Sequence, residues 1–362
     1  MMMNSRIGLY VFRNLLIATA VSTIAVTMTI WVTQSLKLLD MVINAGAPFL
    51  VFLWMMALTV PTFIGIIMPI ALAGAILFSY NKMVMDSELV VMRAVGMGPW
   101  RLAAPALALA GIVTASVYIL NIFASPYANR ELVRLQYAVR HEFATVLIRE
   151  GSFNDISDRM TVYLRKRLDN GEMQGLLVHD TRQPGKDISV MAQRGVMADS
   201  PGGVKVIMLD GIRQEVDSKT GQMSELYFDR YLVDFQVNDD RPVDRAVDPR
   251  ERALSELMDP PPDIRENPYM MRQFAAELHM RLSSPLLALA FSIIALAALL
   301  GGDYNRRGQG RRIAAAALLV IALQSASLGL TGLAGKLPAV IPLMYLLYLA
   351  PLVPGVWLLS RR

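Results

Sequence analysis

The chain has no cysteine, few charged residues and only 3 histidines among its 362 residues. Without cysteine, neither a disulfide framework nor a thiolate metal site can form. Charged residues make up 18% of the chain, whereas soluble domains typically carry about 25%. Hydrophobic residues reach 54%, and the mean hydropathy is +0.41. This shortage of charge indicates that lipid forms part of the solvent around the protein.

The formal net charge of +5 is distributed unevenly along the chain. Between Tyr127 and Arg281, 26 acidic residues outnumber 22 basic ones. The rest of the chain holds 13 basic and 4 acidic residues, and the basic ones stand in short stretches beside apolar runs. Membrane topology explains this pattern, so we expect no nucleic-acid partner.

Six apolar runs reach the length of about 20 residues that a membrane-spanning helix needs. They lie at Leu15–Leu36, Phe49–Tyr80, Leu102–Ala124, Leu282–Leu300, Ile313–Leu333 and Val340–Leu359. The second run is long and contains Pro61 and Pro69, which predicts a kinked or tilted helix. We therefore predict an α-helical polytopic membrane protein with six transmembrane helices.

Basic residues near these runs predict the orientation, because cytoplasmic loops of membrane proteins carry an excess of Lys and Arg. Eleven basic residues fall on one side of the predicted membrane, and the other side has only Lys37 and Lys336. Both termini are therefore expected in the cytoplasm, with the segment between Tyr127 and Arg281 outside. Lys37 and Asp40 are expected to mark a loop after the first span.

A different pattern begins near Phe143, where the apolar residues change from blocks to alternation. The segments Thr161–Arg165, Val204–Met208 and Leu226–Phe235 predict strands, separated by turn signals such as Asp169–Gly171. Strands at this spacing suggest a sandwich or a jelly roll. We therefore expect an all-β domain inserted between the third and fourth spans.

The chain thus divides into three predicted parts. Residues 1–126 contain spans one to three, with a cytoplasmic helix near 84–98, and residues 268–362 contain spans four to six. Residues 127–267 form the β-domain and a connector, Asn238–Asn267, whose acidic, proline-rich composition predicts extended chain. The β-domain either covers and stabilises the protein, or handles an exported molecule or docks another β-domain.

No pattern of catalytic residues stands out. The histidines are too dispersed for an obvious metal site, and His141–Glu142 lacks the second histidine of a zincin motif. Gly329–Lys336 is a poor phosphate loop, because Leu337 replaces the required Ser or Thr. The interiors of the spans hold no ionisable residue, although ion-coupled transporters usually need one. We expect no catalytic residue, cofactor or metal, and any transport energy should come from a partner.

The segment Lys82–Trp100, between spans two and three, is the candidate docking site for that partner. Ser87 is placed to cap a short helix, with Glu88 in its first turn. Gly96 or Gly98 would end this helix.

The faces of this short helix differ in composition. Helical spacing puts Leu89, Met92 and Arg93 on one face, and Glu88 shares a face with Val91 or Met92. Exposed apolar residues beside one acid and one base suit insertion into a groove on another protein. The alternative is an amphipathic helix that lies on the bilayer surface.

The segment Asp86–Gly96 (Asp-Ser-Glu-Leu-Val-Val-Met-Arg-Ala-Val-Gly) resembles the coupling-helix signature of the lipopolysaccharide-export permeases, the LptF/LptG (YjgP/YjgQ) family. Ala276–Arg281 resembles the family's Glu-Leu-x-x-Arg motif before span four, and Asn305–Arg311 resembles its Gly- and Arg-rich loop. The order of six spans with an insertion is similar along nearly the whole chain. Leu232–Gln236 resembles LptF more than LptG.

The resemblance implies a permease subunit in the inner membrane, paired with a sister permease above a cytoplasmic ATPase dimer. It implies that the ATPase docks on Asp86, Glu88, Leu89, Met92, Arg93 and Gly96. A periplasmic jelly-roll domain would join a periplasmic bridge protein and a bitopic regulator. The substrate would be lipopolysaccharide, extracted from the outer leaflet of the inner membrane.

One position departs from the family pattern. Family members often carry two basic residues at the periplasmic end of span one, positioned for substrate phosphates, whereas this chain has only Lys37 there. Lys37 is therefore the candidate substrate contact, and an ordinary lysine at the lipid interface is the alternative. A less phosphorylated glycolipid, or recognition mainly by the sister subunit, is also open. The rival function is a non-transporting membrane scaffold, but a scaffold needs no coupling helix.

Overall fold

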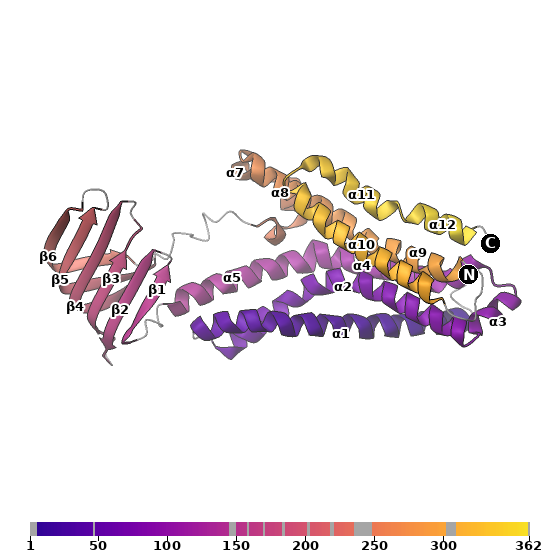
Figure 1. Cartoon of the computed structure of the whole chain (residues 1–362), viewed down its shortest axis with the longest axis horizontal. Coiled ribbons are helices and arrows are strands. Elements are labelled where there is room, and N and C mark those ends of the chain that lie inside the picture. The colour runs from indigo at the N-terminus through magenta and orange to yellow at the C-terminus, as the bar shows by residue number, and fades with distance from the viewer. Residues whose placement is uncertain are drawn as a thin grey trace. The chain divides into compact units, whose positions relative to one another are not determined.

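The computed structural model describes residues 6–45, 48–144, 150–157, 159–168, 171–182, 185–200, 203–217, 221–234, 248–301 and 309–360. The chain divides into two compact units. One, the helical unit, comprises Met1–Lys37, Trp54–Val133 and Val247–Arg362, and the other comprises Leu38–Leu53 and Arg134–Ala246 and contains the sheet. Figure 1 labels the elements of both units.

Six helical segments among the described residues are long and apolar enough to cross a membrane, which confirms the six predicted spans. The first two are the single helices α1 (Arg6–Ala45) and α2 (Phe49–Met85). The third is α4 (Pro99–Ile119), which continues through the π-helical turn η1 (Leu120–Ala124) into α5 (Ser125–Ala144). The fourth is α8 (Pro268–Ser283), which continues through η3 (Ser284–Leu286) into α9 (Leu287–Leu300). The last two are α10 (Gly310–Ala334) and the run of η4 (Pro338–Val340), α11 (Ile341–Leu349) and α12 (Leu352–Ser360).

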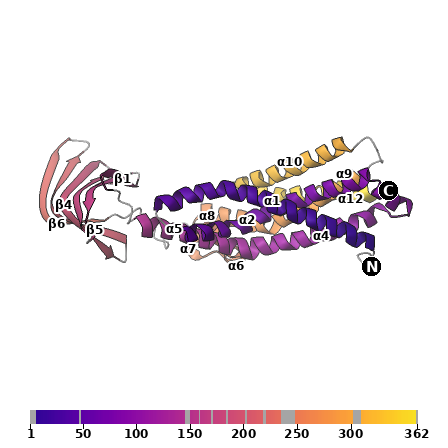
Figure 2. The same cartoon turned by 90° about the horizontal axis from the view of Figure 1, so that it is seen from below.

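Helix α9 occupies the middle of the helical unit. Twelve of its 14 residues are buried, and it packs against α4, α10 and α12. Its sequence is apolar on every side, as expected for a helix that is surrounded by other helices. The start of α1, the end of α12 and the short helix α3 (Glu88–Ala94) lie at the same end of this unit (Figure 1, Figure 2).

Helix α1 is longer than its apolar run. It continues to Ala45, so the prediction of a loop at Lys37 is wrong. The physical reason lies in the sequence, which has no glycine or proline to break the helix between Gly8 and Gly46. Helix α2 also remains continuous, through both Pro61 and Pro69.

The inserted all-β domain is confirmed. It consists of β1 (Ser152–Ser157), β2 (Met160–Arg167), β3 (Met173–Asp180), β4 (Lys186–Ser200), β5 (Gly203–Asp217) and β6 (Met223–Asp234). These strands form one antiparallel sheet in chain order, and the three predicted strands lie within β2, β5 and β6, apart from Phe235, which is outside the described residues. A jelly roll contains Greek-key crossovers, whereas the described strands form a simple meander.

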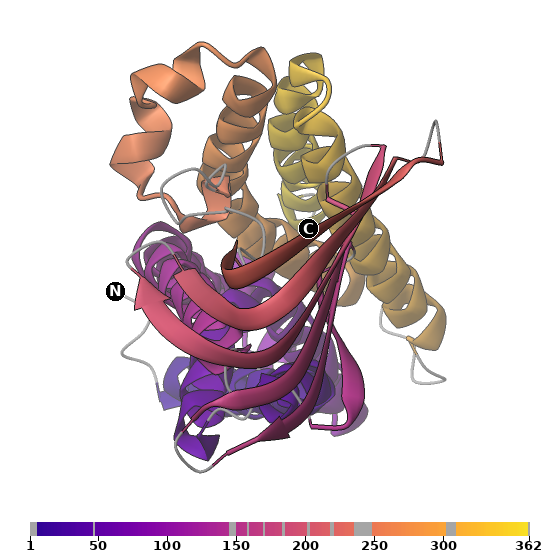
Figure 3. The ribbon, with the colours of Figure 1, turned by 90° about the vertical axis from the view of Figure 1, so that its left-hand side faces the viewer.

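The sheet is strongly curved (Figure 3). At Asp210 the backbone of β5 adopts a left-handed φ of 54°, and the register with both neighbouring strands skips this residue. A Cβ atom added to Gly211 would lie 2.2 Å from the carbonyl oxygen of Met191 and 2.5 Å from the ring of Phe228. Only glycine fits this close approach, and such irregularities bend a strand. Because the sheet is curved, apolar side chains of neighbouring strands, such as Val162, Val178 and Val206, pack together in one buried cluster.

The connector is not extended over its described residues, 248–267, so that prediction is wrong. It forms three short helical segments, η2 (Pro249–Glu251), α6 (Leu254–Met258) and α7 (Pro262–Arg265). Prolines begin two of these segments because their fixed φ suits a first helical turn. Leu257 and Ile264 are buried against Phe274 of α8, and this small core holds the segments in place. Residues 238–247 of the predicted connector lie outside the described residues.

Candidate functional site

Helix α3 follows α2 after only two residues, Asp86 and Ser87. The amide of Asp86 donates to the Lys82 carbonyl at 2.8 Å, and that of Ser87 donates to the Val84 carbonyl at 3.2 Å. Ser87 is the N-cap residue of α3, as predicted, but it has a left-handed φ of 62° and its side chain makes no capping hydrogen bond. A capping serine normally has an extended backbone, and the tight turn from α2 forbids that conformation here.

The other end of α3 is a Schellman motif at Gly96. The Gly96 amide donates to the Arg93 carbonyl at 2.9 Å, and the Met97 amide donates to the Met92 carbonyl at 3.2 Å. Gly96 has a φ of 86°, which is the left-handed conformation that this motif requires and that glycine tolerates. The helix therefore ends at one of the two glycines that the sequence singled out, and Gly98 precedes the first turn of α4.

The face of α3 that carries Leu89, Met92 and Arg93 is turned inward. Leu89 is only 2% exposed within the core of the helical unit, and Met92 packs against the same core. The Nη2 atom of Arg93 donates to the Leu300 carbonyl at the end of α9, at 2.8 Å. This carbonyl has no partner within its own helix, and a cation is favoured near a helix C-terminus. The expectation that Leu89 is exposed for docking is therefore wrong, because this face anchors α3 to the protein itself.

The opposite side of α3 is available to a partner. What we call the outer face of α3 comprises Glu88, Val91 and Val95, together with Met85 at the end of α2 and Asp86 in the turn. Val91 is 61% exposed and Val95 is 79% exposed. The outer face thus combines two carboxylates with three solvent-accessible apolar side chains, the composition that the docking prediction requires.

Lys37 lies far from these residues. It is exposed on α1, 31 residues after the start of the helix at Arg6, which corresponds to about 46 Å along the helix axis. The structure therefore does not bring the predicted substrate contact together with the predicted docking residues.

A second polar site, whose role the sequence did not predict, is the Arg281 clamp at the start of span four. Arg281 is 2% exposed, and its Nε atom donates to Oε1 of Glu277, itself 9% exposed, at 2.7 Å. Its Nη1 atom donates to the Arg252 carbonyl at 2.7 Å. Its Nη2 atom donates to the carbonyls of Pro249 and Arg250, each at 3.1 Å. One guanidinium thus fastens the connector to α8.

Further ion pairs join the same connector to α5. Arg130 of α5 donates through Nε to the Glu251 carbonyl at 3.2 Å and pairs with Glu256 at 3.1 Å. Arg252 pairs with the other oxygen of Glu256 at 2.9 Å. Burial acts to raise the pKa of the Glu256 carboxyl, but the hydrogen bonds and charges of Arg252 and Arg130 outweigh it and lower this pKa. The helices on either side of the β-domain insertion are therefore linked through one short segment.

The sequence contains one signal for the Arg281 clamp. Glu277 and Arg281 are four residues apart, which is the spacing of an ion pair on a helix, and they belong to the segment that resembles a family motif. The carbonyl partners of Arg281 carry no such signal, because a main-chain oxygen is the same in every residue.

Comparison with known proteins decides the family. The model of the lipopolysaccharide export system permease LptF/LptG family matches residues 9–361. The chain belongs to this family. Its members are transport permeases rather than enzymes, so the LptF/LptG assignment agrees with the six apolar helices and the inserted β-domain.

Individual relatives of this LptF/LptG permease are distant in sequence. The chain is 27% identical over 357 residues to an uncharacterized protein of Rickettsia prowazekii, which covers 98% of each chain. It is 24% identical over 177 residues to the lipopolysaccharide export system permease protein LptF of Escherichia coli K12, which covers 48% of each chain. The LptF protein of Shigella flexneri matches to the same extent.

Proposed function

We propose that this permease is the LptF-type subunit of an ATP-driven transporter that extracts lipopolysaccharide from the inner membrane and passes it to a periplasmic bridge protein. The observation that carries the proposal is the family match over residues 9–361. The matches to LptF proteins favour LptF over its sister subunit, with which it would form a heterodimer.

The outer face of α3 is proposed to dock a cytoplasmic ATPase dimer. Glu88 would pair with a basic residue in the ATPase groove, while Val91 and Val95 would exclude water around that pair. Motion of the ATPase would then reach the membrane helices, because Leu89 and Arg93 hold α3 against the core and against α9. Glu88 would also stabilise the positive N-terminal end of α3. An experiment must therefore distinguish this structural role from pairing with the ATPase.

The distribution of basic residues supports a cytoplasmic location for α3. The end of the helical unit that carries α3 and the start of α1 also carries the basic residues Arg6, Lys82, Arg93 and Arg101, and such residues favour the cytoplasm. The β-domain would then be periplasmic.

No other described strand pairs with the outer edge of β6, where Tyr227 and Leu226 are exposed. An open edge suits strand addition by the β-domain of the bridge protein or of a bitopic regulator.

Lys37 is proposed to contact a phosphate of the glycolipid. It is exposed and lies near the far end of α1 from the ATPase side. A contact between exposed charges contributes less than about 1 kcal/mol, and more where water is excluded. A lone lysine would leave much of the headgroup recognition to the sister subunit.

The experiment that tests the function is purification of the permease with its native partners, followed by reconstitution with lipopolysaccharide in proteoliposomes. We expect an ATPase and lipopolysaccharide to co-purify, and ATP to release lipopolysaccharide to added bridge protein. The permease alone is expected to hydrolyse no ATP. A stable complex with the periplasmic partners that contains no ATPase would instead identify the chain as a scaffold.

A further inference from the structure

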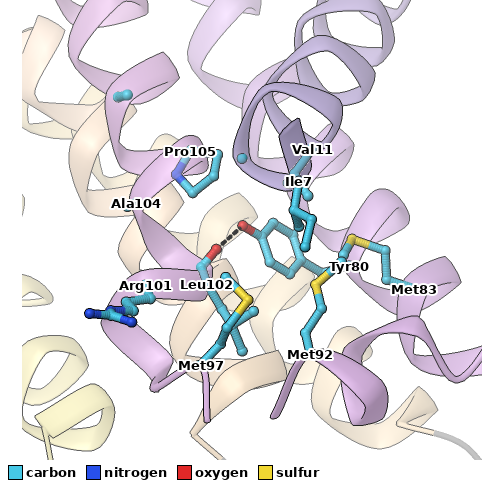
Figure 4. A pocket seen from close by; sticks show the side chains of 12 residues that line it. Ile7, Val11, Tyr80, Met83, Met92, Met97, Arg101, Leu102, Ala104 and Pro105 are labelled. Atoms are coloured by element: carbon cyan, nitrogen blue, oxygen red, sulfur yellow. Dashed lines mark hydrogen bonds between the residues drawn. The ribbon is translucent and has the colours of Figure 1, made fainter. Parts of the chain in front are cut away.

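A cavity of about 240 Å³ lies where the start of α1, the end of α2 and the start of α4 meet α3 (Figure 4). Its walls come from the start of α1, the end of α2, the end of α3 and the first turns of α4. Ile7, Val11 and Met83 contribute apolar surface from α1 and α2, and Met92 and Met97 contribute the side towards α3.

The interior of this cavity offers apolar surface rather than free polar groups. The hydroxyl of Tyr80 donates to the Leu102 carbonyl at 2.6 Å, so its donor is already used. Three of the lining side chains are methionines, Met83, Met92 and Met97, which are flexible and adapt to apolar ligands of varied shape. Ligands of such cavities bury apolar surface and are oriented by a few polar groups.

The polar group of this cavity is at its rim. The stem of Arg101 lines the cavity, and its guanidinium is directed away from Tyr80 (Figure 4). Arg101 is exposed, and none of the ion pairs found among the described residues includes it. An apolar interior with a cation at the rim matches an amphiphile that has one chain and an anionic head.

We propose that this cavity binds an acyl chain of an anionic phospholipid of the cytoplasmic leaflet, with the lipid phosphate on Arg101. The proposal rests on the orientation given under Proposed function, which puts this end of the helices at the cytoplasmic leaflet, where anionic lipids concentrate and each nearby basic residue strengthens binding. Its volume lies below the range of pockets for drug-sized ligands, which begins at about 300 Å³, so it suits a section of one chain. The bound chain would contact Met92 and Met97, and would therefore brace α3 against α4.

The test uses the purified transporter in lipid nanodiscs that contain a photoreactive phospholipid with a diazirine in its acyl chain. Labelled peptides are identified by mass spectrometry, with either a phosphatidylglycerol or a phosphatidylethanolamine probe. We expect saturable labelling of the segments that contain Ile7, Met83 and Met97, stronger with the anionic probe. Arg101→Gln should reduce labelling by phosphatidylglycerol about fivefold, while Arg13→Gln, an exposed arginine of α1 outside the cavity, should not.

A second pair of variants tests whether the chain enters the cavity. Ala108→Phe places a ring in the cavity and should abolish labelling of Met97, while Ala115→Phe, on an exposed part of α4, should leave it unchanged. The Arg101 pair decides the question if Ala108→Phe does not fold. Equal labelling by both probes that is insensitive to Arg101→Gln would overturn the proposal. Crosslinking of the cavity segments to a protein partner in place of lipid would overturn it as well.

Discussion

Two arginines fix main-chain carbonyls at opposite ends of the helical unit. Arg93 holds the last carbonyl of α9, and Arg281 holds three carbonyls of the connector. A guanidinium suits both places because it presents five donors in a rigid plane and stays charged when buried. Lysine could keep the charge at either position but not the set of hydrogen bonds.

At Arg281, we predict that Arg281→Gln destabilises the protein by about 3–5 kcal/mol, because Glu277 would be left as an unpaired buried charge. The measurement is thermal unfolding in detergent, combined with the rate of proteolysis near Pro249. Arg272→Gln is the matched control, since Arg272 is exposed on the same helix and bonds only the Pro268 carbonyl. Replacing Glu277 by Gln as well should restore part of the stability. Unchanged unfolding in the single variant would show that the clamp is not a stabilising contact.

Substitution of Glu88 tests the prediction that α3 docks an ATPase. Glu88→Ala should leave the protein folded in the membrane but weaken ATPase binding by about 2–5 kcal/mol, because the partner's charge loses its counterpart. Glu88→Gln keeps much of the shape and should be milder. The measurement is the amount of co-purified ATPase and of released glycolipid at matched expression.

The control for Glu88 is Glu266→Ala, which removes an exposed carboxylate from the connector. Wild-type ATPase binding and glycolipid release with Glu88→Ala would leave Glu88 with the simpler task of stabilising the start of α3. Restoration of release by a charge reversal on the ATPase would identify the partner residue.

Among the elements, the connector has a predicted dependence on pH. The pKa of Glu256 is lowered from its ordinary value of 4.5, so its contribution to folding is complete above that pH and is lost as the pH falls through the lowered pKa. A fluorophore on Met258→Cys, an exposed position of α6, should therefore report loosening of the connector below about pH 4.5. Glu256→Gln should loosen the connector at neutral pH and flatten the titration below about pH 4.5. A titration that is identical with and without Glu256 would contradict this assignment.

The elements also differ in how far the sequence could predict them. Spans and strands follow from the length and period of apolar runs, and the position of α3 follows from its glycines. The orientation of α3 could not be predicted, because both Leu89 and Val91 are apolar and only packing decides which is buried. The bond from Arg93 to α9 joins residues 207 positions apart. Helical turns in the connector were missed because a proline-rich composition fits extended chain and helix starts equally.

The largest prediction is that the β-domain and the end of α12 lie on opposite sides of the membrane. The chain has no cysteine, so single cysteines can be introduced at Ser224 in β6 and at Ser360 at the end of α12. An impermeant thiol reagent added to intact cells, after permeabilisation of the outer membrane, should label Ser224→Cys only. Ser360→Cys should react only after the inner membrane is opened. Labelling of both positions from the same side would refute the six-span topology.

The bonds from arginine to main-chain carbonyls have a consequence for how this protein diverges among species. A carbonyl oxygen is present whatever the side chain, so the bonds from Arg281 and Arg93 place no demand of their own on the side chains at positions 249, 250, 252 and 300. Paired substitutions usually reveal contacts between two side chains. A side chain that bonds a main-chain oxygen has no partner side chain to change with it. We therefore expect paired substitutions to reveal neither the contacts of Arg93 nor those of Arg281 with carbonyls. The bonds from Arg93 to α9 and from Arg281 to the connector carbonyls therefore depend on one side chain each, whereas the pair of Arg130 with Glu256 depends on two.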